Sequence, residues 1–259
     1  MNSVRNILAI AGKELRGYFA SPMAYIVIGL FSVLFGFFFW LFLRIFIAQS
    51  QQMMQFGGGG GSANINQQMI RYLLQNTTII ILFVMPMITM RTYSEEKRSG
   101  TIELLLTSPV TDAQIIIGKF LGALGLYGAM LGVTMIYMAI LFALGNPELK
   151  PIVAGYLGLL LVGGGFIAIG LFISSLTKNQ IVAGVLTFAV FLMLWVIGWP
   201  ADQAGPVMRQ VLQSLSMVDH FDDFARGIID TKHIIYYLSL ITFGLFLTAK
   251  SVDVERWRG

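Results

Sequence analysis

The side chains able to do acid–base or metal chemistry are few. The chain has two histidines and no cysteine, and the histidines do not form a His-Glu-x-x-His pattern. The candidate residues gather in one stretch: Asp219, His220, Asp222, Asp223 and, further on, His233. They could bind a cation or exchange protons, but a helix cap with a solvated polar face is the better explanation for charges at nearly consecutive positions. We therefore predict no catalytic residue and no metal site.

Nucleotide chemistry has no recognisable site in this sequence either. A phosphate-binding loop needs Gly-x-x-x-x-Gly-Lys followed by Ser or Thr, because the lysine and the loop amides hold the phosphates. Gly57–Gly61 lacks the lysine, and Gly163–Gly165 lies inside an apolar run. We interpret Gly57–Gly61 as a flexible linker and predict no cofactor for this chain.

The most patterned polar segment is Arg91–Lys119. It begins with charges of both signs, Gly100 allows a turn, and Thr101 can cap a following helix. Ile102–Leu106 then forms a short amphipathic stretch before Pro109. A short helix of this kind suits docking into a groove on another protein. The alternative is a solvated loop with ordinary helix ends.

These segments must be positioned by a largely apolar chain. Of the 259 residues, 56% are hydrophobic and 12% are charged, whereas a soluble domain has roughly 25% charged residues. This composition argues against a soluble globular protein. The net charge is +4, but the lysines and arginines cluster at the edges of apolar runs, which is typical of membrane topology. We therefore expect a lipid bilayer, and no nucleic acid, as the partner.

Six apolar runs are long enough to cross a bilayer, which requires about 20 helical residues. They are Tyr25–Phe46, Leu73–Met90, Phe120–Leu144, Ile152–Leu176, Ile181–Trp199 and Ile234–Ala249. The predicted fold class is all-α: one polytopic membrane domain over residues 1–259 with six transmembrane helices.

Residues 1–21 lack the central apolar block of a cleavable signal. Apolar side chains from Val4 to Phe19 recur on one helical face, and Arg5, Lys13, Glu14 and Arg16 lie on the other. We predict an amphipathic interfacial helix that ends at Ser21. A plain lead-in helix without a special role is the alternative.

Residues 200–233 mix charges with apolar side chains at spacings of three and four. This pattern predicts two short helices at the outer interface, broken near Ser216–Asp219.

The orientation follows from the lysine and arginine count of the connecting segments. Eleven belong to the set that contains both termini and the Arg91–Lys119 segment, against six in the other set. Because positive charge favours the cytoplasmic side, we predict that both termini are cytoplasmic.

Small residues predict close helix packing in the third span. They recur on one face at spacings of three and four, which lets a neighbouring backbone approach, within one subunit or across a dimer. The predicted helix-packing residues are Gly118, Gly122, Gly125 and Gly132.

The run Glu95–Pro109 resembles the signature of ABC type-2 transporter permeases, the membrane subunits of six-helix exporters. Two further segments resemble the same family. Lys13–Arg16 with Ser21-Pro22 is similar to its amphipathic connecting helix, and Asp219–Phe221 with Arg226-Gly227 is similar to its outer segment before the last span. Within the family, the chain looks closest to the gliding-motility-associated branch.

The resemblance implies a permease of the bacterial inner membrane that dimerises and binds separate cytoplasmic ATPase subunits. ATP and Mg²⁺ would then belong to the partner, and this chain would not itself be an enzyme. Residues 91–119 would supply a coupling helix between the second and third spans. The implied ATPase contacts are Glu95, Glu96, Arg98, Gly100, Thr101, Glu103, Leu104 and Leu105.

Two other functions are compatible with a six-span protein. A secondary transporter that works without ATP predicts buried ionisable groups and often internal repeats, and we find neither in the spans. A membrane anchor for a larger complex does not need the patterned Arg91–Pro109 segment.

Overall fold

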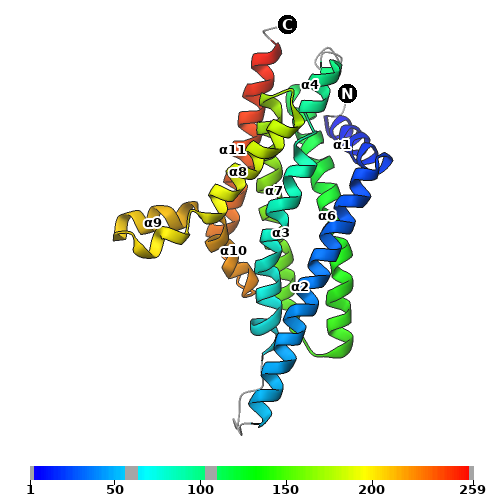
Figure 1. Cartoon of the computed structure of the whole chain (residues 1–259). Helices are drawn as coiled ribbons and strands as arrows, with labels where there is room; N and C mark the ends of the chain where they lie inside the picture. The colour runs from blue at the N-terminus through cyan, green and yellow to red at the C-terminus, as the bar shows by residue number, and fades with distance from the viewer. Residues whose placement is uncertain (1–2, 56–63, 103–109, 257–259) are drawn as a thin grey trace.

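A computed structural model describes residues 3–55, 64–102 and 110–256, and every regular element in these ranges is helical. The ribbon in Figure 1 is an elongated bundle of long helices with a few short ones at its ends and side. The bundle is built from α2 (Pro22–Gln55), α3 (Arg71–Thr89), α6 (Asp112–Leu144), α7 (Leu149–Leu176), α8 (Gln180–Val196) and α11 (Thr231–Arg256). The other helices are α1 (Ser3–Ala20), η1 (Asn66–Ile70), α4 (Ser94–Ser99), η2 (Trp199–Gln203), α9 (Pro206–Leu215) and α10 (Met217–Ala225).

The six predicted spans correspond to six helices that are long and apolar enough to cross a membrane. The all-α, six-span prediction is therefore confirmed. The apolar runs specify these helices, because backbone groups inside a bilayer must bond within their own segment.

Three span boundaries differ clearly from the prediction. The first span was expected to end at Phe46, but α2 continues to Gln55. The third span was expected to start at Phe120, but α6 begins at Asp112, where the Thr111 hydroxyl accepts from the Gln114 amide and completes a capping box. Lys119 therefore lies inside a helix. The last span was expected to end near Ala249, yet α11 continues to Arg256, beyond its apolar stretch.

Helix α7 occupies the centre of the bundle, and 72% of the residues in its 18-residue apolar stretch are buried. Its glycines allow neighbours to approach closely. A Cβ at Gly163 would meet the ring of Tyr127 in α6 at 2.1 Å, and one at Gly158 would meet Phe224 in α10 at 2.7 Å. A similar Cβ at Gly170 would lie 2.3 Å from Thr89 in α3. The bundle is thus assembled around small residues of α7, which the sequence analysis did not single out.

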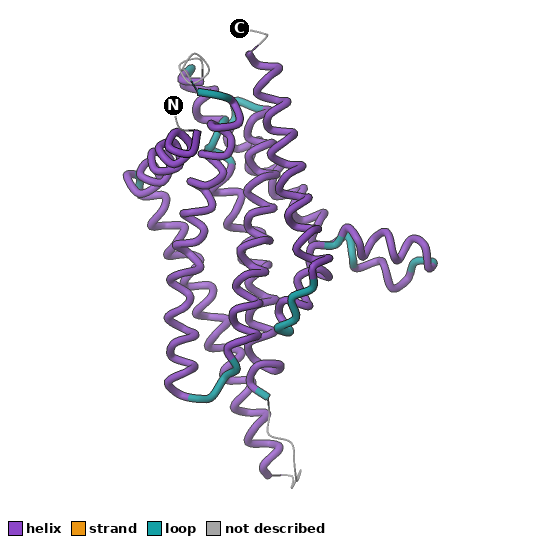
Figure 2. The backbone as a smooth tube through the Cα atoms, turned by 180° about the vertical axis from the view of Figure 1, so that it is seen from behind, coloured by secondary structure: helices purple, strands orange, loops and turns teal. Residues whose placement is uncertain are grey.

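The predicted N-terminal helix is α1, which ends at the Ser21-Pro22 junction with α2. Figures 1 and 2 both show it at the same end of the bundle as α4 and the end of α11. One face of α1 packs on α6, so part of this helix is covered by protein and not by lipid alone.

The segment before the last span contains the two expected short helices, α9 and α10. The break falls at Ser216, whose hydroxyl accepts from the Asp219 amide and caps α10. Helix α10 packs on α7, whereas α9 projects sideways from the bundle and has no buried residue (Figures 1 and 2).

Candidate functional site

The patterned segment identified in the sequence lies at the end of the bundle that also carries α1. Helix α4 follows a short turn after α3 and ends at Gly100, whose φ of 73° is left-handed. That conformation suits glycine because it has no Cβ. Residues 103–109 lie outside the described residues, and so do Glu103, Leu104 and Leu105 of the predicted coupling helix.

A buried lysine joins α4 to two other helices. The Lys119 ammonium in α6 lies 2.9 Å from Glu14 Oε1 in α1 and 2.7 Å from Glu96 Oε1 in α4. It also donates to the Thr92 carbonyl at 3.2 Å and sits 5.2 Å from the centre of the Tyr93 ring. Only 1% of the Lys119 side chain is exposed. We call Lys119, Glu14 and Glu96 the lysine junction.

Other contacts fix α4 on its remaining sides. Lys97 is buried and forms an ion pair with Glu255 near the end of α11. At the start of α4, the amides of Tyr93 and Ser94 both donate to the Ser174 hydroxyl of α7 at 3.1 Å. Helix α4 is consequently tied to α6, α7 and α11 and, through Lys119, to α1.

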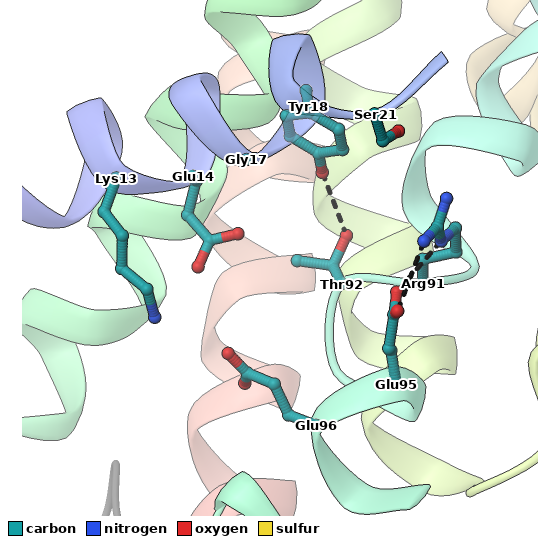
Figure 3. A pocket seen from close by; sticks show the side chains of 9 residues that line it. All are labelled: Lys13, Glu14, Gly17, Tyr18, Ser21, Arg91, Thr92, Glu95 and Glu96. Atoms are coloured by element: carbon teal, nitrogen blue, oxygen red, sulfur yellow. Dashed lines mark hydrogen bonds and ion pairs between the residues drawn. The ribbon is translucent and has the colours of Figure 1, made fainter. Parts of the chain in front are cut away.

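A polar pocket of about 280 Å³ opens between α1 and the turn into α4. Figure 3 shows Glu14 and Glu96 facing each other across it, with Lys13, Tyr18 and Thr92 on its walls. The Tyr18 hydroxyl lies 3.4 Å from the Thr92 hydroxyl. Burial raises the pKa of Tyr18 to about 12, so its phenol stays neutral at physiological pH. The pocket therefore presents charged side chains together with the neutral hydroxyls of Tyr18 and Thr92.

The structure separates the predicted ATPase contacts into two groups. Arg98, Gly100 and Thr101 are exposed at the end of α4, where a partner can reach them. Glu95 is exposed but forms an ion pair with Arg91 at 2.9 Å. Glu96 instead points inward to Lys119, so its partner lies within the chain.

Sequence reasoning missed the lysine junction, because a lone lysine at the start of an apolar run is also typical of an ordinary span boundary. Glu14 and Lys119 are far apart in the chain, and their meeting depends on how α1 crosses α6.

The predicted packing glycines of α6 face α1 over part of their length. A Cβ would lie 2.6 Å from Ile10 at Gly118 and 2.6 Å from Glu14 Cβ at Gly122. At Gly125 it would lie 3.5 Å from Leu15, whereas no atom lies within 4 Å of the position at Gly132. In this subunit, the close approach is between α6 and α1.

Two acidic residues before the last span contact side chains of other helices. Arg71 of α3 donates to Asp222 Oδ1 at 2.8 Å, which ties α10 to α3. His233 Nε2 lies 2.7 Å from Asp223 Oδ2, which ties α10 to α11. Among the described residues, no three His, Cys, Asp or Glu side chains come together as metal ligands. The arrangement fits the structural explanation, in which these side chains hold helices together.

Known proteins with similar sequences are transporter proteins of membranes. A family model described as "ABC-2 family transporter protein" matches residues 8–249. Two curated relatives, each called "Probable multidrug ABC transporter permease YbhR", come from Escherichia coli strain K12 and Escherichia coli O157:H7. Each is 31% identical over 157 residues, which is 59% of this chain and 40% of the relative. The chain thus spans less than half the length of the relatives it matches, and these matches do not support the gliding-motility branch.

Proposed function

Because the chain belongs to the ABC-2 family of transporter proteins, we propose that it is the membrane permease subunit of an ATP-driven exporter and that α4 leads into its ATPase-docking segment. The observation that carries this proposal is the way α4 is held. Its end is exposed at Arg98 and Thr101, while Glu96 and Lys97 are anchored to α6 and α11. Because its base is fixed, α4 can transmit a displacement of its exposed end by a partner to the membrane spans.

The family normally works with a cytoplasmic ATPase, so the α4 end would face the cytoplasm, together with both termini. The excess of lysine and arginine in the same segments supports this orientation in the inner membrane. ATP and Mg²⁺ would bind the partner, and hydrolysis would occur there.

A second permease subunit, identical or different, would complete the transporter. The name of the Escherichia coli relatives makes drug-like compounds the first substrate class to test.

The test is co-purification with the ATPase. Reversing the charge with Glu103→Lys should weaken binding, because a docked charge pair becomes repulsive. Changing both Leu104 and Leu105 to Asp should weaken it further, because a docked apolar contact is lost. The matched control is Lys150→Glu at the other end of the bundle, which should bind normally. Normal binding by both coupling-segment variants would contradict the proposal.

A further inference from the structure

The lysine junction connects three helices that come from separate parts of the chain. Its two carboxylates come from α1 and α4, and its single ammonium comes from α6. We propose that Lys119 is a positioning residue that makes α1, α4 and the start of α6 move as one unit. Displacement of the coupling segment would then reach α1 as well as the spans. This inference rests on the proposed function.

The charge balance of the junction favours a positioning role over simple stabilisation. One ammonium serves two carboxylates, and the second Glu96 oxygen, Oε2, is buried without a hydrogen-bond partner. Buried ion groups add little net stability compared with neutral side chains of similar volume, but they fix one arrangement, because any other would leave a charge unpaired. Lys119 therefore defines where α1 and α4 sit.

Packing reinforces the junction along the same stretch of α6. Glu14, which binds Lys119, also contacts Gly122 so closely that a Cβ there would lie 2.6 Å from its own Cβ. The Gln114 side chain bonds Asn6 and Ser3 at 3.2 Å, one turn before Gly118. Helix α1 is thus fixed to α6 by a small-residue face and by charge.

The junction also spans the coupling segment. Glu96 precedes residues 103–109 and Lys119 follows them, so the ion pair closes the base of the segment. A partner that moves this segment must either carry α1 with it or break a buried ion pair.

The experiment uses the full permease with its ATPase. The chain has no cysteine, so Gly17→Cys in α1 and Ser99→Cys at the end of α4 can carry a spin-label pair. Both positions are exposed. The main variant changes Lys119 to Met and both Glu14 and Glu96 to Gln, which removes all three charges together. The control, Lys250→Gln with Asp253→Asn, removes an exposed ion pair of α11 at the same end of the bundle.

In the unmodified permease we expect a narrow distribution of distances between the two spin labels, and this distribution should stay narrow when ATP binds. In the neutral variant we expect a broad distribution of label distances and an about tenfold lower rate of permease-dependent ATP hydrolysis. ATPase binding and the melting temperature should not change. The control should resemble the unmodified protein. A neutral variant with a narrow distance and full hydrolysis would overturn the inference.

Lys119→Met alone leaves two carboxylates facing each other, so we expect it to fold poorly and to be rescued by the two glutamine changes. Glu14→Gln alone keeps the Lys119–Glu96 pair and should fold while still broadening the label distance. A narrow distance in Glu14→Gln would also overturn the inference. If no ATPase binds the unmodified permease, the proposed function fails, whereas the label distances without nucleotide still test the junction.

Discussion

At the scale of single residues, two glycines of one helix differ in what surrounds them. A Cβ at Gly122 would lie 2.6 Å from Glu14 Cβ, while no atom of a neighbouring helix lies within 4 Å of the same position at Gly132. Gly122→Ala should therefore push α1 away from α6 and lower the melting temperature in detergent. Gly132→Ala should leave it unchanged or raise it, because alanine is the better helix former by about 1 kcal/mol. Equal melting temperatures for the two variants would contradict this packing.

His220 gives a prediction about pH. Burial, and next the neighbouring His233, lower the pKa of His220 from 6.5 to about 4. Between these values the unfolded chain binds a proton that the folded chain does not, so stability falls as the pH drops through this window. The remaining groups near this ring are Tyr236, Lys232 and Asp223.

His220→Gln removes the titrating ring. Its melting temperature should fall less steeply than that of the unmodified protein between pH 6.5 and pH 4. The corresponding loss in free energy of unfolding should be modest, roughly 1 kcal/mol, because the side chain is only half-buried and solvent screens part of the effect. Parallel melting curves over this window would count against a depressed pKa.

Residue-level reasoning from the sequence succeeded where the signal was local. Gly100 was expected at a turn and adopts a positive φ. The inward orientation of Glu96 could not be predicted, because it depends on Lys119 in another helix. A lysine beside an apolar run is also what an ordinary span boundary contains, so its type alone did not reveal burial.

At the scale of elements, α9 exposes apolar side chains. Among the described elements, η2 and α10 are the ones that contact it appreciably. Val207, Met208 and Val211 are exposed. An isolated helix of this length is not stable in water, so we expect lipid or another subunit to cover this face.

Spin labels placed one at a time along α9 test this expectation. Labels at Val211 and Leu215, on the apolar face, should be accessible to oxygen dissolved in lipid, and labels at Arg209 and Gln213, on the opposite face, to a water-soluble relaxing agent. A uniform aqueous profile along the helix would rule out burial of its apolar face.

The existence of the spans was predictable from the sequence because apolar length alone determines them in a bilayer. Their ends were less so. The capping box at Thr111 starts α6 among polar residues, and α11 continues through Lys250 and Asp253, which form an ion pair. Local hydrogen bonds and ion pairs extend these helices beyond the apolar runs that identified them.

At the scale of the whole molecule, the even number of spans returns the chain to the end of the bundle at which the first span begins. Helix α1, helix α4 and the end of α11 share one end, and the start of α7, which contains Lys150, lies at the other (Figure 1). The order of helices along the chain was predictable, but the central place of α7 was not, because it depends on which neighbours its glycines admit.

The central claim is that a separate ATPase docks at the α4 end of this permease. Single cysteines at Ser99 and at Lys150, both exposed, can be joined to the ATPase by a short bifunctional crosslinker in the assembled complex. We expect Ser99→Cys to crosslink to the ATPase and to be protected from a cytoplasmic thiol reagent when the ATPase is bound. Lys150→Cys should do neither and should react only from the outside. A crosslink from Lys150→Cys, or none from Ser99→Cys in a complex that co-purifies, would contradict the account.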